Sequence, residues 1–321
     1  AAPGTWILSG FSELYQEGYG GSTNPQNGEY QYDGWGIPLN DAYKYMGGTS
    51  MSNPLVAGAA TVVRDYYEKA HAHSASAALV KAILINSAVD LLDENNDGVD
   101  DNDYPIPNNH EGWGRVDLAI ATDGSHQFVE DTTGLNTGGA ISYPYSIASA
   151  GQPLKVSLVW SDFRSSESVA LNRVNDLDLV VTAPDGSQYQ GNVFSGGWSQ
   201  TGGAVDRVNN VENVFVQAAE AGMWTVEVKA YNVPYGPQPF ALVVDGSFGN
   251  VDYPPSVTLV SPTDGSDVAG SVTIQIAADD QEDEEGSLTV EWNVDGGTWL
   301  PTTYNNGSGR YEANWNTTTA A

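Results

Sequence analysis

The sequence predicts an α/β segment followed by two all-β units. Three observations support this fold class. Helical apolar spacing is confined to residues 1–124, a period-two alternation fills 125–248, and a second alternating series occupies 256–321. A Pro-containing linker at 249–255 separates the two β series. The chain has 321 residues, a length at which two or three domains are expected.

Two helices are expected in the first zone. One begins near Ser50 and carries PLVAGAATVVRDYYEKAH, with Pro54 in its first turn, where a missing N–H costs little. Its first half is small and apolar on all sides, which is typical of a fully buried helix. The second helix, SAALVKAILINSAVDLL, starts at Ser76 and keeps apolar residues at helical spacing.

The other two zones read as strands. PLKVSLVWSD, NDLDLVVTAPDG, ENVFVQAA, MWTVEVKAY and PFALVVDG are separated by Gly, Pro, Asp and Asn turns, as in an all-β sandwich or barrel. SVTLVSP, SVTIQIAAD, LTVEWNVDGG and RYEANW have immunoglobulin-like spacing. Because such a sandwich needs about seven strands, we expect this last unit to be partial.

Composition excludes several classes of function. The net charge is −30, from 11 basic and 41 acidic residues, so nucleic acid and anionic membranes are not expected as partners. The absence of cysteine excludes disulfides, thiolate metal sites and cysteine catalysis. No apolar run approaches the roughly 18 residues of a membrane span.

The most informative stretch is YMGGTSMSNPLVAGAA, residues 45–60. It places Ser50 where a glycine turn runs into the start of the first helix. Backbone N–H groups are unpaired there and the helix dipole is positive, so an oxyanion would be stabilised. Ser50 could alternatively be only an N-cap, a position that favours serine.

The string G-T-S-M-x-x-P followed by V-A-G closely resembles the nucleophile motif of subtilisin-like serine proteases, the subtilases. APGTWILS (2–9), KAILINSA (81–88) and GWGRVD (112–117) are similar to further segments of that family. LKVSLVWSD, VNDLDLVVTAPDG, NNVENVF and AYNVPYGPQPF resemble the β-barrel domain of one alkaline-protease subgroup, and the last unit resembles bacterial Ig-like modules.

The resemblance implies a definite architecture and activity. The fold would be the C-terminal part of an α/β subtilase domain, an all-β jelly-roll or β-barrel domain and a partial Ig-like β-sandwich. Ser50 would be the nucleophile and its backbone N–H an oxyanion donor, in a monomeric, secreted, extracellular endopeptidase that acts on proteins or peptides. We expect the chain to be a fragment truncated at both ends.

The general base of the family has no counterpart beside Ser50. None of the 49 residues before Ser50 is a histidine. His71 and His73 lie about 30 Å away along the helix at 1.5 Å per residue, and His110 and His126 are expected at the surface. The family's Asp and His would then lie upstream of this chain, which alone should be inactive. Two alternatives stay open: a non-catalytic β-module that binds a polysaccharide or protein through exposed aromatics such as Trp198, and a subtilase pseudo-enzyme.

Structural calcium is expected at a loop between the second helix and GWGRVD. DENNDGVDDND (93–103) places oxygen ligands at the spacing of half an EF-hand loop, with a glycine at the sharp turn. An Asx-rich turn is the alternative, because the bidentate Glu is replaced by Tyr104. The candidate ligands are Asp93, Asn95, Asp97, Asp101 and the carbonyl of Val99.

A weaker calcium candidate lies in the strand NDLDLVV. Alternation puts Asp176 and Asp178 on one face, where two carboxylates repel unless solvated or bridged by a cation. Asp162, Asn210 and Glu212 could join such a site. The simpler interpretation is a strand whose polar face is in solvent.

Overall fold

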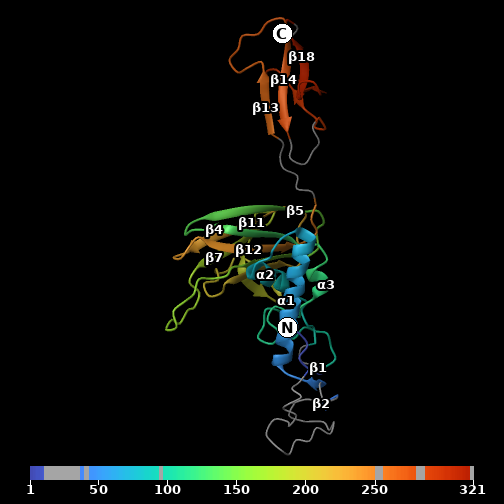
Figure 1. Ribbon diagram of the computed structural model, residues 1–321. Helices are drawn as coiled ribbons and strands as arrows, with labels where there is room; N and C mark the ends of the chain where they lie inside the picture. Colours follow the sequence, from blue (N-terminus) through green and yellow to red (C-terminus); the bar gives the residue numbers. More distant parts are fainter. Residues whose placement is uncertain (11–36, 40–42, 94–96, 250–255, 280–285, 319–321) are drawn as a thin grey trace, which may run out of the picture. The chain divides into compact units, whose positions relative to one another are not determined.

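The computed structural model divides the chain into two compact units, Ala1–Phe248 and Gly249–Ala321 (Figure 1). No helix among the described residues is long and apolar enough to cross a membrane. The structure describes residues 1–10, 37–39, 43–93, 97–249, 256–279 and 286–318.

Three helices form in the described part of the first unit: α1 (Thr49–His71), α2 (Ala77–Asn86) and α3 (Leu118–Ala121). Helix α2 starts where expected, because the Ser76 side chain accepts a hydrogen bond from the Leu79 N–H as an N-cap. It ends at Asn86, so its predicted continuation through SAVDLL is wrong. The Ser87 hydroxyl and N–H both turn back to the Ile83 carbonyl, and Val89 then pairs with Arg115 in a β-bridge.

A small antiparallel sheet precedes α1. Its strands are β1 (Ile7–Gly10), β2 (Ile37–Pro38) and β3 (Tyr43–Met46), in the order β1-β3-β2. The parallel sheet that a subtilase domain implies is not found in the part of the chain that the structure describes.

Residues 127–245 form a sandwich of two antiparallel sheets. One has the order β10-β6-β12-β4 and the other β5-β11-β7-β8-β9. Alternate residues of β11, from Trp224 to Ala230, are buried between the sheets, as the period-two pattern predicts. The strands are β4 (Gln127–Leu135), β5 (Ala140–Ile147), β6 (Leu154–Val159), β7 (Asp176–Thr182), β8 (Gln188–Ser195), β9 (Trp198–Thr201), β10 (Val211–Val216), β11 (Gly222–Asn232) and β12 (Gln238–Asp245).

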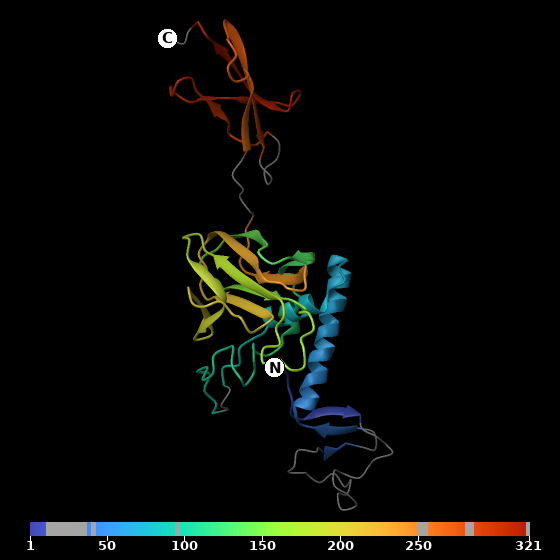
Figure 2. The same cartoon turned by 90° about the vertical axis from the view of Figure 1, so that its left-hand side faces the viewer.

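Helix α2 packs on the outer face of the β10-β6-β12-β4 sheet (Figure 2). Val159 and Val243 point outward into a second core that they share with Leu79 and Ile83 of α2. The buried Asn86 side chain donates hydrogen bonds to Ser157 Oγ (3.1 Å) and to the carbonyls of Lys155 and Val243 (3.2 and 3.4 Å). The boundary expected between residues 124 and 125 therefore falls inside one packed unit.

The first half of α1 is buried only at Ala59, so the expectation of a fully buried helix is wrong for this chain. Leu55 is 42% exposed and Val62 48% exposed, and only Ala59, Val63 and Tyr67 of α1 are buried. The apolar face that the sequence encodes is present but uncovered.

The second unit is a small β structure. One sheet has the order β13-β14-β18-β17, and β15 pairs with β16. Among its described residues, the buried core consists of Ile274, Ile276 and Tyr311, with half-buried aromatics around them. The strands are β13 (Ser256–Ser261), β14 (Ser271–Asp279), β15 (Glu291–Trp292), β16 (Leu300–Pro301), β17 (Thr303–Asn305) and β18 (Arg310–Asn316).

Candidate active site

Ser50 occupies a strand–turn–helix junction. Strand β3 ends at Met46, Gly47 and Gly48 make the turn, and Ser50 is the second residue of α1. Gly48 has φ of 137°, a left-handed conformation that a side chain would strain. The turn leaves Ser50 exposed at the end of the helix.

The backbone around Ser50 can stabilise negative charge. The Gly48 carbonyl accepts hydrogen bonds from the N–H groups of Met51 (3.0 Å) and Ser52 (3.4 Å). The Ser50 N–H has no partner among the described residues. It lies in the first turn, where the helix dipole is positive, so it can donate to an oxyanion that forms on a group attacked by Ser50.

The segment at the start of the chain packs against this turn. The Gly48 N–H donates to the Gly4 carbonyl at 2.6 Å. A Cβ on Gly4 would lie 2.6 Å from Ser52 Oγ and 3.1 Å from the Gly48 carbonyl oxygen. A side chain at residue 4 would therefore crowd the serine turn, and glycine allows APGT to approach it closely. The sequence motif contained this glycine, but its contact could not be foreseen from spacing.

No histidine in the described ranges hydrogen-bonds Ser50. His71 lies at the far end of α1, and His73 binds the Glu130 carboxylate, with Nε2 2.6 Å from Oε2. His110 stacks on Tyr104. Among the described residues, Ser50 therefore has a candidate oxyanion donor but no general base.

His126 is buried, so the expectation that it lies at the surface is wrong. Its Nδ1 is 3.9 Å from the Asp123 carboxylate, and its Nε2 has no hydrogen-bond partner among the described residues. Burial lowers the pKa of His126, while Asp245 and Asp123 partly oppose this shift. The lowered pKa favours the neutral imidazole over the imidazolium.

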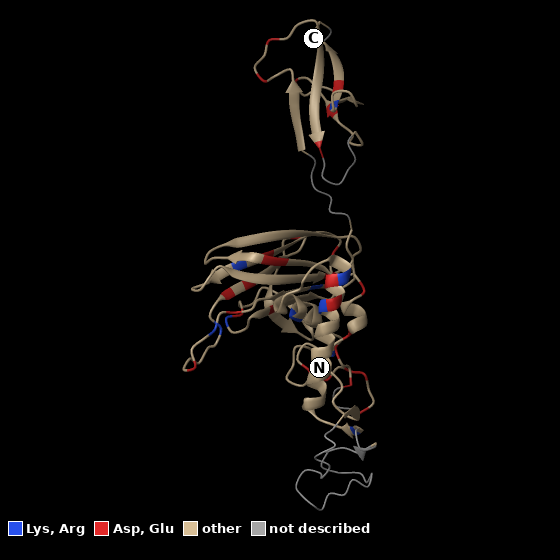
Figure 3. Ribbon diagram, in the orientation of Figure 1, with Lys and Arg blue, Asp and Glu red and all other residues tan. Residues whose placement is uncertain are grey.

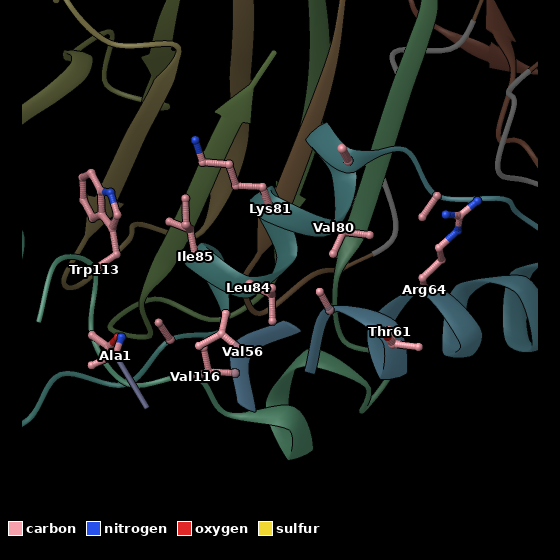
Figure 4. A pocket seen from close by; sticks show the side chains of 15 residues that line it. Ala1, Val56, Thr61, Arg64, Val80, Lys81, Leu84, Ile85, Trp113 and Val116 are labelled. Carbon is pink, nitrogen blue, oxygen red and sulfur yellow. The ribbon is translucent and has the colours of Figure 1, made fainter. Parts of the chain in front are cut away.

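A groove runs beside the exposed part of α1 (Figure 4). Its volume is about 690 Å³, and side chains from α1, α2 and the segment 113–116 line it. Most of these are apolar, with Arg64 and Lys81 among them. Its principal apolar lining residues are Val56, Val80, Leu84, Ile85, Trp113 and Val116.

The expected calcium loop forms an Asx-type turn where it is described. Asp93 accepts hydrogen bonds from the N–H groups of Asp97 (2.9 Å) and Gly98 (3.1 Å), and Asp97 accepts one from Val99 (2.9 Å). Gly98 has the left-handed φ expected of the sharp turn. Asp101 is exposed, and Asn95 lies outside the described residues. Calcium at this loop stays a prediction.

Asp176 and Asp178 are buried, so the expectation of a solvent-facing strand is wrong. Arg173 Nη1 lies 3.0 Å from Asp176 Oδ2, and Arg207 Nη1 lies 3.4 Å from the same oxygen. Arg207 also binds Asp178 through both terminal nitrogens. Guanidinium groups thus supply the cation that bridges the two carboxylates. No group of three or more His, Cys, Asp or Glu side chains in the described ranges could hold a metal ion.

Glu212 has a strongly raised pKa, which the sequence did not predict; the sequence indicated only that Glu212 could join a calcium site. It is 1% exposed, and its Oε2 accepts a hydrogen bond from the Leu179 N–H at 2.7 Å, while Oε1 has no partner among the described residues. Burial raises the pKa of Glu212 to about 9, and nearby Asp178, Asp206 and Asp176 add to the shift. The pKa of Asp176 is also raised by burial, to about 6, against the opposing effect of Arg173 and Arg207.

Two segments match known families. Residues 12–114, which include Ser50, match the model of the subtilase family. Residues 255–321 match the model of a bacterial Ig domain. The chain therefore carries a subtilase-like segment and an Ig-like domain.

Distant relatives are named as serine proteases. The chain is 25% identical to the serine protease/ABC transporter B family protein tagD of Dictyostelium discoideum, over 82% of this chain and 17% of that protein. It is 26% identical to tagB of the same organism, described in the same words, over 78% of this chain and 15% of that protein. The chain thus spans less than a fifth of the length of these relatives.

A solved structure with some likeness is the Bacillus licheniformis lipase BlEst2 in propeptide form. The identity is 10%, over 59% of this chain and 43% of that one, with a TM-score of 0.24. A likeness of this size does not bear on the fold.

Proposed function

We propose that this chain carries the nucleophile of a subtilisin-like serine endopeptidase. The observation that carries the proposal is the position of Ser50: exposed, at the first turn of α1, behind a glycine turn, within the segment that matches the subtilase family. The runner-up interpretations are a pseudo-enzyme and a binding protein built from the β units.

The proposed chemistry is acyl transfer followed by hydrolysis. Ser50 Oγ attacks the carbonyl carbon of a peptide bond, and a base takes its proton. The Ser50 N–H donates to the oxyanion of the tetrahedral intermediate. The amine then leaves with a proton, and water hydrolyses the acyl ester to regenerate Ser50.

The base and its carboxylate partner must come from outside the described residues. We place the Asp and His of the triad, and the oxyanion Asn, in polypeptide upstream of residue 1. The uncovered face of α1 and the apolar groove beside it support this, because they offer surface against which further polypeptide can pack.

Several finer features belong to the same proposal. The resemblance supports the alkaline-protease subgroup and secretion. The strand order supports a jelly roll, because β4 to β7 alternate between the two sheets, as do β10 to β12. Lys and Arg residues are scattered and are outnumbered by acidic residues (Figure 3). This charge distribution supports a monomer that acts on proteins or peptides, and it disfavours nucleic acid and membranes as partners. We also propose that residues 93–101 bind a structural calcium ion.

The test is hydrolysis of casein by protein expressed with its upstream coding sequence. Ser50→Ala should abolish hydrolysis, and Ser149→Ala, at an exposed loop, should leave it unchanged. Hydrolysis that survives Ser50→Ala would refute the assignment. A well-folded but inactive longer protein would favour the pseudo-enzyme.

A further inference from the structure

Three exposed aromatic rings gather at one end of the sandwich. Phe163 is 41% exposed, and Tyr231 and Tyr235 are each 59% exposed. Phe163 and Tyr235 stack, with ring centroids 4.4 Å apart and planes 4° from parallel. The Tyr231 ring lies under the Arg207 guanidinium at 3.8 Å. Clustered exposed rings indicate a binding surface more often than isolated ones do.

The stacked pair stands on a braced backbone. The Asp162 carboxylate accepts hydrogen bonds from the N–H groups of Phe163, Val174 and Asn175. The Asn175 side chain, which is 1% exposed, donates to the Tyr235 carbonyl at 2.9 Å and accepts from the Tyr235 N–H at 3.2 Å. Both ring-bearing loops are therefore tied to the sandwich core, which lowers the entropy cost of binding.

A polar pocket of about 360 Å³ adjoins the Phe163 ring. Its lining includes three asparagine side chains. Asn209 Nδ2 donates to Asp206 and Asn210 Nδ2 donates to the Trp160 carbonyl, and each of these amides carries a second N–H. Asn172 accepts a hydrogen bond from Ser165, and no partner of its Nδ2 is found among the described residues. The lining residues are Asp162, Phe163, Ser165, Asn172, Arg173, Val208, Asn209 and Asn210.

The two arginines next to this pocket are already neutralised. Arg173 pairs with Asp176 and donates to the Arg207 carbonyl, and Arg207 pairs with Asp178. Asp162 has its oxygens occupied by backbone N–H groups. Arg164 is a further cation at this surface, with its guanidinium 5.9 Å from the centroid of the Phe163 ring. The site therefore offers aromatic rings and amides beside one arginine, in a protein whose net charge of −30 disfavours anionic ligands.

We propose that this surface, formed by Phe163, Tyr231, Tyr235 and the adjoining pocket, binds a neutral glycan. The apolar C–H face of a sugar ring fits flat against an exposed aromatic ring, and amide side chains can both donate to and accept from sugar hydroxyls. This site is independent of Ser50 and of the proposed proteolysis. It would hold the chain on a polysaccharide or on the sugar of a glycoprotein.

The experiment is affinity electrophoresis of the 321-residue chain in native gels that contain hydroxyethyl cellulose, glucomannan or mixed-linkage β-glucan. Alginate serves as the anionic gel. We expect retardation in at least one neutral gel and none in alginate. Tyr235→Ala and Phe163→Ala should weaken binding at least about tenfold, and Tyr235→Phe should retain it. The matched control is Trp299→Ala, an equally exposed aromatic of the other unit, which should bind as the parent chain does.

The proposal is overturned if no neutral gel retards the chain, or if alginate retards it as strongly. It is also overturned if retardation survives both alanine variants while Trp299→Ala abolishes it. Binding of denatured casein that is lost in Tyr235→Ala, without any glycan binding, would show a peptide surface instead. Thermal melting of each variant confirms that the exposed substitution has not unfolded the sandwich.

Discussion

Glu212→Gln should remove a large part of the pH dependence of stability in the first unit. The Glu212 carboxyl has a pKa of about 9 in the folded chain, against an ordinary value of 4.5. Between these values the folded state keeps a proton that the unfolded state releases, so stability falls as pH rises. The stabilising contribution is complete below about pH 4.5 and is lost progressively up to about pH 9.

The magnitude follows from the size of the shift. Each pH unit inside this window costs about 1.4 kcal/mol, so from about pH 5 to pH 8 the loss is about 4 kcal/mol. Glutamine has the same shape as glutamate and does not ionise, and its side-chain oxygen can still accept the hydrogen bond from the Leu179 N–H. The free energy of unfolding of Glu212→Gln minus that of the parent chain should therefore increase by about 4 kcal/mol between about pH 5 and about pH 8.

Urea unfolding followed by tryptophan fluorescence measures this difference, because Trp160 and Trp224 are buried in the sandwich. Asp185→Asn is the matched control. Hydrogen bonds from Ser187 lower the pKa of Asp185, so it is ionised in both states across this pH range and its removal leaves the slope unchanged. Parallel stability curves for the parent chain and Glu212→Gln would refute the reasoning.

Two further predictions concern the first unit. Asn86→Ala removes three hydrogen bonds between α2 and the sheet and should destabilise the unit by about 2–3 kcal/mol, lowering its Tm by roughly 4–10 °C. An unchanged Tm would show that the hydrogen bonds of Asn86 do not stabilise the packing of α2 on the sheet. Chelation with EDTA should lower the Tm if calcium is bound at residues 93–101. A Tm that is the same with EDTA and with added calcium would exclude a structural calcium ion at this loop.

The local parts of the fold could be predicted from the sequence. The start of α1 at the Gly-Gly turn, the Ser76 cap of α2 and the alternating strands such as β11 depend on neighbours within a few residues. The packing of α2 on β6 and β12 could not be foreseen. It depends on the outward faces of strands that lie far along the chain, and those faces carry ordinary strand residues.

The same distinction applies to the candidate sites. The motif around Ser50 is contiguous, so its place at a helix start followed from the sequence. Asp176 and Asp178 were placed on one face correctly. Their burial depends on Arg173 and Arg207, which reach them from separate loops, and alternation alone carries no sign of this. Phe163 and Tyr235 are distant in sequence, and only the fold brings their rings together.

The most direct test of the central claim is labelling of Ser50 by a fluorophosphonate probe, with the modified residue located by mass spectrometry. The protein expressed with its upstream coding sequence should be labelled at Ser50, since a base would then activate the hydroxyl. The 321-residue chain alone should not react, because no histidine in the described ranges hydrogen-bonds Ser50. Labelling of another residue, or equal labelling of Ser50 in the 321-residue chain alone, would contradict the assignment of Ser50 as a nucleophile that depends on an upstream base.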